Sequence, residues 1–323
     1  MSQPSSSGEQ DRQRAWTTYW HSGALHSCPT SFVGNYAGAI AEFWSEVGKS
    51  LPAPARVLDV GTGNGSIPKF LMDIAADRGV VEIDGVDAAQ IAPTWHSTAD
   101  TPRVRFHSGV RMEALPFPDA AFDVVCSQFA IEYASAPEAW TEALRVLKPG
   151  GSLCWVMHHR ASVFASVAAQ ERDHLAWLLQ ADGLFGAAAD LAPWLMRHRA
   201  GEASVAMSSE ANAARSRFNG IQQDLESRIQ ASASADVLGE VRAQLHAILA
   251  RSTEPVAALS QYRQQLQESM LRSSDLVDRA LDSDRVRNLA SWLEDHRPGA
   301  TVAVETLRQE EGILAWGLKL RGP

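Results

Sequence analysis

Short apolar segments alternate with helical segments between residues 55 and 157, and the first of them runs directly into a glycine-rich turn at residues 61–65. Strands that alternate with helices form a mainly parallel sheet, because each crossover is right-handed and returns over a face of the sheet. We therefore predict an α/β fold with a doubly wound sheet. Ligands bind such sheets at the carboxyl ends of the strands.

The same pattern places the individual elements of this core. The expected strands are residues 56–60, 81–86, 104–107, 122–129 and 152–157, and the expected helices are residues 66–77, 88–96 and 137–147.

The long segment after the fifth expected strand has helical rather than strand periodicity. Its apolar stripes are Leu238, Val241, Leu245 and Ile248, then Leu259, Tyr262, Leu266 and Met270, then Val286, Leu289, Ala290 and Leu293. Apolar stripes need a surface to cover. We expect residues 161–298 to form a helical lid or substrate subdomain, inserted after the fifth strand and packed over the ligand edge of the sheet.

Three further segments complete the expected domain organisation. Residues 1–14 are rich in serine, glutamine and charge, which predicts a disordered tail. Residues 15–50 are expected to form an N-terminal helical cap on the binding core, residues 51–160. Residues 299–323 are expected to form an antiparallel C-terminal hairpin that completes the core sheet.

Composition restricts the possible partners. The formal net charge is −9 and no cluster of lysine and arginine is evident, which argues against a nucleic-acid substrate. No secretory signal and no apolar run near the ~20 residues that cross a bilayer are evident. Cys28, Cys126 and Cys154 are widely spaced and read as buried thiols, so we expect no metal site and a reducing, cytoplasmic location for a soluble protein. The oligomeric state cannot be read from the sequence.

The glycine-rich turn and one acidic residue carry the strongest functional signal. Glycines let the backbone turn from strand to helix and approach a ligand closely. Asp87 ends the next expected strand, where a carboxylate can accept hydrogen bonds from both ribose hydroxyls. Together the two signals favour a cofactor that contains adenosine. Taken singly, the turn could be purely structural and Asp87 a helix cap.

Several segments together resemble the class I S-adenosylmethionine-dependent methyltransferases. A dinucleotide site prefers Gly-x-Gly-x-x-Gly, but here the third glycine comes one position early and Ser66 occupies its place. The matching segments are Leu-Asp-Val-Gly-Thr-Gly-Asn-Gly at residues 58–65, Asp87, Glu-Ala-Leu-Pro-Phe at 113–117, Phe-Asp-Val-Val-Cys-Ser at 122–127 and Leu-Lys-Pro-Gly-Gly at 147–151. The C-terminal hairpin also suits this family.

The resemblance implies positions for the cofactor, S-adenosyl-L-methionine. Asp59, Gly61 and Gly63 would lie around its methionine end, with Thr62 and Asn64 in the same turn. Asp87 and Ala88 would lie at the ribose, Met112 and Glu113 at the adenine, and Ser127 near the methionine moiety. Arg111 departs from the family pattern, which often has near this position an aspartate that contacts the adenine amine.

Four residues are candidates for a catalytic base or an orienting group. Glu132 and Tyr133 follow the fourth expected strand, and His158 and His159 follow the fifth. The resemblance implies that the place after the fourth strand faces the substrate, and a positioned base typically contributes ~10²–10⁴-fold in rate. We expect at least one of the four to be catalytic, although each could equally have a structural role.

An aromatic N-terminal segment and the choice of reaction complete the predictions. Trp16, Tyr19 and Trp20 could close over the cofactor or simply pack against the core. We expect methyl transfer to a small molecule, for which a specialised metabolite is one candidate. The alternatives are a protein that binds the same cofactor without transferring its methyl group, and a nicotinamide-dependent oxidoreductase. The accepting atom (O, N, S or C) stays open.

Overall fold

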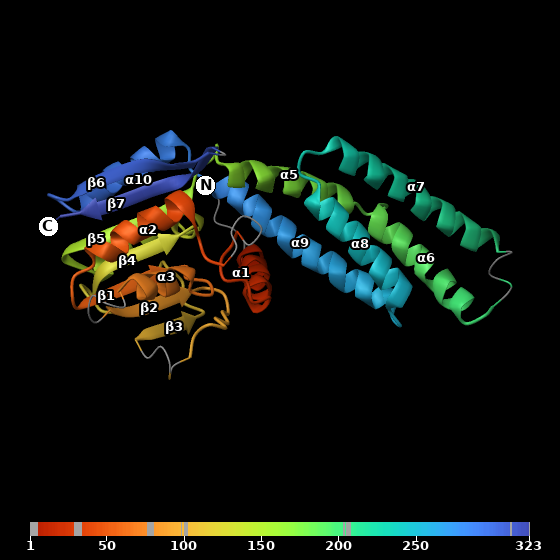
Figure 1. The fold of residues 1–323 in the computed structure, drawn as a ribbon, viewed down its shortest axis with the longest axis horizontal. Coiled ribbons are helices and arrows are strands. Elements are labelled where there is room, and N and C mark those ends of the chain that lie inside the picture. Colours follow the sequence, from red (N-terminus) through yellow and green to blue (C-terminus); the bar gives the residue numbers. More distant parts are fainter. Residues whose placement is uncertain are drawn as a thin grey trace. The chain divides into compact units, whose positions relative to one another are not determined.

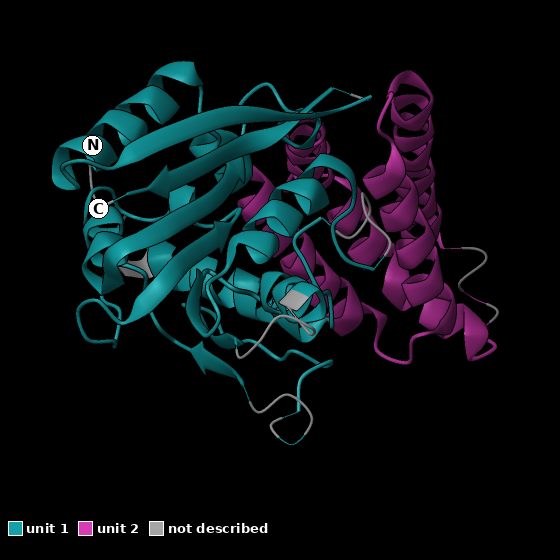
Figure 2. Cartoon of the chain, turned by 60° about the vertical axis from the view of Figure 1, so that its left-hand side comes forward, with its two compact units in different colours: residues 1–166, 275–323 teal, residues 167–274 magenta. Residues whose placement is uncertain are grey.

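The computed structural model describes residues 6–28, 34–75, 81–97, 99, 103–202, 204, 208–310 and 312–322. The chain divides into two compact units (Figure 2). Unit 1 comprises Met1–Ser166 and Asp275–Pro323, and unit 2 comprises Val167–Ser274. We describe each by itself.

Unit 1 contains a seven-stranded sheet of the predicted kind (Figure 1). The strands are β1 (Ala55–Val60), β2 (Val81–Asp87), β3 (Val104–Ser108), β4 (Phe122–Gln128), β5 (Leu147–His158), β6 (Thr301–Gln309) and β7 (Gly312–Arg321). Their order is β3-β2-β1-β4-β5-β7-β6. Strands β1–β5 are parallel, and the β6–β7 hairpin is antiparallel, with β7 on β5. This confirms the α/β doubly wound fold and the terminal hairpin.

The helices lie before, between and after these strands. They are α1 (Ser6–His21), α2 (Gly38–Ser50), α3 (Ser66–Ala75), the 3₁₀ turn η1 (Ile131–Tyr133), α4 (Glu138–Val146), α5 (Val163–Leu178), α6 (Leu184–Arg199), α7 (Ser209–Ala231), α8 (Asp236–Arg251), α9 (Pro255–Arg279) and α10 (Ser283–His296). None of the helices in the described ranges is both long and apolar enough to span a bilayer.

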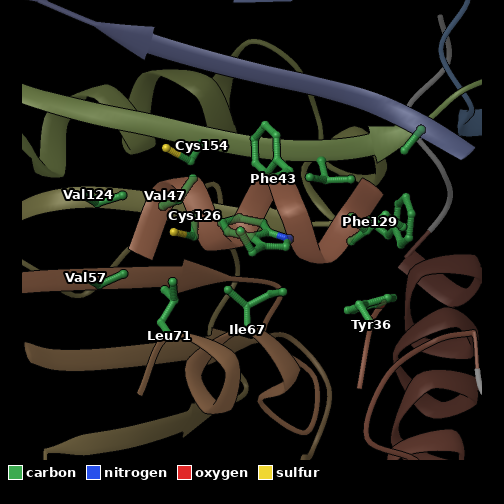
Figure 3. Packing of buried hydrophobic residues seen from close by; sticks show 14 of the residues in the cluster. Tyr36, Phe43, Val47, Val57, Ile67, Leu71, Val124, Cys126, Phe129 and Cys154 are labelled. Carbon is green, nitrogen blue, oxygen red and sulfur yellow. The ribbon is translucent and has the colours of Figure 1, made fainter. Parts of the chain in front are cut away.

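Helices cover both faces of the sheet. On one face, Phe43 and Val47 of α2 and Leu71 of α3 pack over apolar residues of β1, β4 and β5 (Figure 3). Cys126 and Cys154 are buried there as free thiols, as predicted. On the other face the apolar residues of α4 and α10 pack against the remaining core side chains. A sheet buried on both faces is typical of parallel strands.

The strand order creates a binding edge between β1 and β4. The chain winds from β1 outward to β3 and then returns to β4 on the other side of β1. The carboxyl ends of β1, β2 and β4 therefore meet at one edge, and the two neighbouring crossovers leave a crevice there. Asp59 pairs in register with Gly85 of β2 and Cys126 of β4, which places it near this edge.

Unit 2 is helical and has its own apolar core. The α8 stripe of Leu238, Val241, Leu245 and Ile248 is buried as predicted. Leu259 and Leu266 of α9 are buried in the same cluster, with Tyr262 and Met270 packed against it, and α6 and α7 supply most of the remaining contacts. The expected helical insertion is confirmed, while its cover over the ligand edge stays a prediction.

Two expected boundaries differ from the division seen in the structure. The third apolar stripe, Val286, Leu289 and Leu293, belongs to α10 and packs on the sheet of unit 1, so the second unit ends at Ser274 instead of residue 298. The tail expected to be disordered at residues 1–14 is helical from Ser6, and the first five residues lie outside the described part. The helix is held by tertiary contacts, including the ion pair between Arg12 and Asp275 at 2.8 Å.

The helix expected at residues 88–96 is also absent. Other side chains bind its backbone N–H groups, which a helix would use internally. Thr17 Oγ1 accepts from Gln90 N at 3.0 Å, Ser108 Oγ from Ile91 N at 3.2 Å, and Asn64 Oδ1 from Ala92 N at 2.9 Å. Side-chain acceptors of this kind compete with helix formation.

Candidate active site

A cavity of about 620 Å³ opens at the carboxyl ends of β1, β2 and β4, entirely within unit 1. Strand ends and the loops after them form its floor, and α1 and the end of α9 contribute to its wall. The residues that line the cavity include Glu9, Arg12, Gln13, Trp16, Trp20, Asp59, Gly61, Thr62, Asp87, Ala88, Arg111, Met112, Glu113, Gln128, Phe129, Tyr133, Asp275 and Arg279. A cavity of this size is typical of small-molecule sites.

The glycine-rich turn is shaped by close contacts that exclude side chains. Gly61 has φ +69°, and a Cβ there would lie 2.2 Å from Ala130 Cβ. Gly63 has φ +53°, and a Cβ there would lie 2.5 Å from the Trp20 ring. Glycine is therefore required both for the left-handed backbone and for the contact with α1.

Asp87 links the turn to the second strand, as its position predicts. Its Oδ2 accepts from Gly63 N at 2.9 Å and its Oδ1 accepts from Ala89 N at 2.8 Å. Burial raises the pKa of Asp87 to about 6, although these two backbone hydrogen bonds lower it. A carboxylate can accept about four hydrogen bonds, so each oxygen keeps a lone pair for a ligand.

Asp59 is a second carboxyl group, near the end of the neighbouring strand β1, and it is buried. It is 1% exposed, and burial raises its pKa to about 7. The Thr62 hydroxyl lies close enough to lower this pKa and the Asp87 charge raises it, yet neither Asp59 Oδ1 nor Thr62 Oγ1 has a well-formed hydrogen bond with any described residue. Two unsatisfied buried oxygen atoms in a cavity wall suggest that a ligand provides their partners.

Gln128 is a cavity residue that the sequence analysis missed. It lies at the carboxyl end of β4 and is 8% exposed. Its Oε1 accepts from Trp44 Nε1 at 2.6 Å, while its buried Nε2 has no partner among the described residues. A polar residue directly after Ser127 at a strand end was a usable signal, because ligands bind at such ends.

Helix α1 forms one wall of the cavity. Trp16 and Trp20 line it and stack on each other with ring centroids 5.7 Å apart. Gln13 Nε2 donates to the Ala88 carbonyl at 2.6 Å. The predicted position of the aromatic segment beside the cofactor site is thus compatible with the structure, and closure over a ligand stays a prediction.

The other expected cofactor residues divide into two groups. Ala88, Met112 and Glu113 line the cavity together with Asp59, Gly61, Thr62 and Asp87. Gly63, Asn64 and Ser127 are not among the lining residues. Asn64 Nδ2 donates to the carbonyls of Trp20 and Ala24 at 2.8 and 2.7 Å, and so holds the end of α1.

Ser127 and Arg111 have structural contacts of their own. Ser127 Oγ donates to the Val60 carbonyl at 2.9 Å and accepts from Ile131 N at 3.1 Å, which ties β4 to β1 and to η1. Arg111 lines the cavity and forms ion pairs with Glu9 and Glu113. Its charge is thus neutralised locally.

The four catalytic candidates occupy different environments. Tyr133 is the one of them that lines the cavity. Glu132 and His158 form a buried pair behind it, with Glu132 Oε1 accepting from His158 Nδ1 at 2.7 Å and from His158 N at 2.8 Å. The Tyr133 and His158 rings meet edge to face, with centroids 5.8 Å apart. His159 instead stacks on Trp316 at 4.2 Å, and its Nδ1 accepts from Ala161 N.

Tyr133 is suited to donating a hydrogen bond rather than to removing a proton. Burial raises the pKa of its hydroxyl well above the usual value, and the Glu132 charge raises it further. The phenol therefore stays neutral at physiological pH. In the buried pair, Glu132 Oε2 and His158 Nε2 have no partner within the described ranges.

Comparison with known proteins identifies the same segment of the chain. A family model described as a methyltransferase domain matches residues 58–155. Demethylmenaquinone methyltransferase of Thermus thermophilus is 37% identical over 102 residues, which are 31% of this chain and 46% of that protein. The uncharacterised methyltransferase YcgJ of Bacillus subtilis is 35% identical over 112 residues, 33% of this chain and 42% of that protein.

A third relative is 27-O-demethylrifamycin SV methyltransferase of Amycolatopsis mediterranei. It is 32% identical over 142 residues, which are 42% of this chain and 47% of that protein. The chain thus spans less than half the length of each of these three relatives. The matched segment contains the glycine turn, Asp87 and strands β2–β4, which carry most of the cavity floor. With this sheet order, this turn and this match, residues 58–155 belong to the class I S-adenosylmethionine-dependent methyltransferases.

Proposed function

We propose that the protein transfers a methyl group from S-adenosyl-L-methionine to a small molecule. The observation that carries this proposal is the position of Asp87. Its carboxylate ends β2, binds Gly63 N of the glycine turn and lines the same cavity as that turn. A turn and a carboxylate so joined suit an adenosine ribose.

The remaining polar groups of the cavity fit the amino-acid end of this cofactor. Asp59 Oδ1 is an unsatisfied acceptor suited to an ammonium group, and Gln128 Nε2 is an unsatisfied donor suited to a carboxylate. Both residues line the cavity, on the neighbouring strands β1 and β4. Gln128 is thus proposed as a cofactor-binding residue in addition to those expected from the sequence.

Chemically, the cofactor supplies a methyl group on a sulfonium, already activated for in-line displacement. The protein has to align the acceptor and exclude water, and alignment alone can contribute up to ~7–11 kcal/mol. Trp16 and Trp20 provide an apolar wall for this purpose. Tyr133 donates a hydrogen bond that orients the acceptor, and the Glu132–His158 pair behind it positions the Tyr133 ring or accepts a proton.

The substrate is proposed to be a small, partly apolar metabolite. The relatives' names concern acceptors such as demethylmenaquinone and demethylrifamycin. The cavity has a mixed aromatic and polar lining, in agreement with acceptors of that general kind. The match to a methyltransferase domain argues against the nicotinamide-dependent alternative.

Calorimetry with purified protein tests the proposal. We expect S-adenosylhomocysteine to bind and NAD not to bind. Asp87→Asn should weaken the binding of S-adenosylhomocysteine by roughly tenfold or more, since it removes a charged acceptor of hydrogen bonds. Asp73→Asn makes the same charge change at an exposed site on α3 and should have no effect.

Two outcomes would decide against the proposal. Absence of affinity for both S-adenosylmethionine and S-adenosylhomocysteine would remove the cofactor assignment. Binding without release of S-adenosylhomocysteine across a broad metabolite panel would favour a protein that binds the cofactor but does not transfer its methyl group.

A further inference from the structure

The cavity contains three arginines, and two of them are neutralised by neighbours. Arg12 Nε contacts both carboxylate oxygens of Asp275 at 2.8 Å. Arg111 pairs with Glu9 and Glu113. Arg279 also lines the cavity, but its side chain forms no hydrogen bond or ion pair with any residue that the structure describes. The Arg279 guanidinium is half-buried and its donors are not used by the protein, so they are available to a ligand that enters the cavity.

Arg279 is electrostatically coupled to Tyr133 and Asp275, two other residues that line the cavity. Burial raises the pKa of Asp275 and of Tyr133, and the Arg279 charge acts in the opposite direction on both. No such effect of Arg279 is felt at Asp59 or Asp87. This separates Arg279 from the residues proposed to hold the cofactor.

The chemistry of the Arg279 guanidinium limits the kinds of ligand that it can bind. A guanidinium presents a planar fork of donors that matches a carboxylate with two parallel hydrogen bonds. Trp16 and Phe129 offer aromatic surface in the same cavity. An acceptor with an aromatic or apolar body and a carboxylate would satisfy both features.

We propose that the methyl acceptor is a carboxylic acid whose carboxylate pairs with Arg279. This inference rests on the proposed function and deepens it by naming the substrate class. The competing explanation is structural: Arg279 is the last residue of α9, where a cation is favoured by the helix dipole. Binding measurements separate the two, because a cap residue has no preference for acids in the cavity.

The experiment compares matched pairs of acids and amides. Protein saturated with S-adenosylhomocysteine is titrated calorimetrically with ten aromatic and aliphatic carboxylates, 2-naphthoate among them, and with the primary amide of each. We expect several acids to bind at least about tenfold more tightly than their amides, as a charge-assisted hydrogen bond predicts. Arg279→Gln should abolish that preference and Arg279→Lys should retain part of it. Arg287→Gln, an equal charge change at an exposed residue of α10, should leave it intact.

Affinity for S-adenosylhomocysteine is measured first in every variant. This distinguishes a failure of the proposed function from a failure of the carboxylate proposal. If the wild-type protein does not bind S-adenosylhomocysteine, the proposed function itself is wrong. If it does bind, but no acid is preferred over its amide, the carboxylate proposal is overturned. The carboxylate proposal is also overturned if Arg279→Gln keeps the preference for acids. It is overturned as well if Arg279→Gln weakens the binding of S-adenosylhomocysteine as much as the binding of the acids, because Arg279 would then belong to the cofactor site.

Discussion

At the scale of single residues, Asp59 and Asp87 are two carboxyl groups on adjacent strands, the first buried and the second half-buried. Both pKa values are raised by burial, to about 7 and about 6. A carboxyl group in this state is partly protonated near neutral pH and gains from a cationic ligand, because the opposite charge favours the ionised form. Ligand binding should therefore be linked to loss of protons from this pair.

This linkage predicts a pH dependence of cofactor affinity. Because the two pKa values are raised, Asp59 and Asp87 of the free protein become protonated when the pH falls below neutral. The ligand then has to displace these protons in order to bind the carboxylates. We expect the Kd for S-adenosylmethionine to rise by about tenfold between pH 8 and pH 6, because the ionised fraction of a carboxyl group with a pKa of about 7 falls by about that factor over this range. Asp59→Asn should flatten the part of the profile near pH 7, and Asp73→Asn should not. Calorimetry across this range tests the expectation, and equal slopes in wild type and Asp59→Asn would contradict it.

The catalytic candidates lead to a second prediction at this scale. Tyr133→Phe should lower kcat by about tenfold or more while leaving the Kd for S-adenosylhomocysteine unchanged, because it removes one oriented hydrogen bond. Glu132→Gln should also lower kcat, whereas His159→Ala should have little effect because His159 stacks on Trp316 instead of lining the cavity. Methyl-transfer kinetics provide the measurement. If these variants and His158→Ala all keep near-wild-type kcat, none of the four residues is catalytic.

At the scale of elements, α1 shows how a short polar segment becomes part of a site. Its sequence has little apolar patterning, yet Arg12, Gln13 and Thr17 each contact a distant part of unit 1. Gly63 must lack a side chain because the Trp20 ring lies against it. The helix and the glycine turn thus fit each other, and a ligand in the cavity would contact both.

We predict that α1 is stabilised by the cofactor. Deletion of residues 1–22 should weaken the binding of S-adenosylhomocysteine by tenfold or more, because it removes the wall formed by Trp16 and Trp20. Trp16→Ala should produce a smaller loss of affinity. S-adenosylhomocysteine should also slow tryptic cleavage at Arg12 and Arg14. His21→Ala, an exposed position at the end of α1, serves as the control. Unchanged affinity after the deletion would show that α1 does not hold the ligand.

At the scale of the whole molecule, two units carry separate apolar cores. Unit 1 contains the sheet and both of its covering layers, and unit 2 contains a helical cluster centred on residues such as Leu245. The proposed cofactor residues and Arg279 all belong to unit 1. A substitution in the core of unit 2 therefore alters none of the proposed cofactor residues.

This organisation predicts two thermal transitions. S-adenosylhomocysteine should raise the transition of unit 1 alone, since a ligand stabilises the unit that binds it. Leu245→Ala should destabilise unit 2 by about 2–5 kcal/mol, the usual cost of such a core truncation, and leave cofactor affinity unchanged. Differential scanning calorimetry provides the measurement. A single transition that shifts as a whole in both tests would mean that the units unfold together.

The local patterns of residues 55–157 and 299–323 were sufficient to predict the sheet, its glycine turn, Asp87 and the terminal hairpin, because strand periodicity and turn chemistry act over short stretches of chain. The stripe of α10 has the same helical period as that of α8, so periodicity could not tell that one packs on the sheet and the other in unit 2. The loop at residues 88–96 was wrongly expected to be a helix because Thr17 and Asn64, which bind its backbone, are distant in sequence. The sequence did not predict Arg279 as a cavity residue for the same reason. It lies about 150 residues from Tyr133 in the sequence, and only the folded chain brings the two residues to one site.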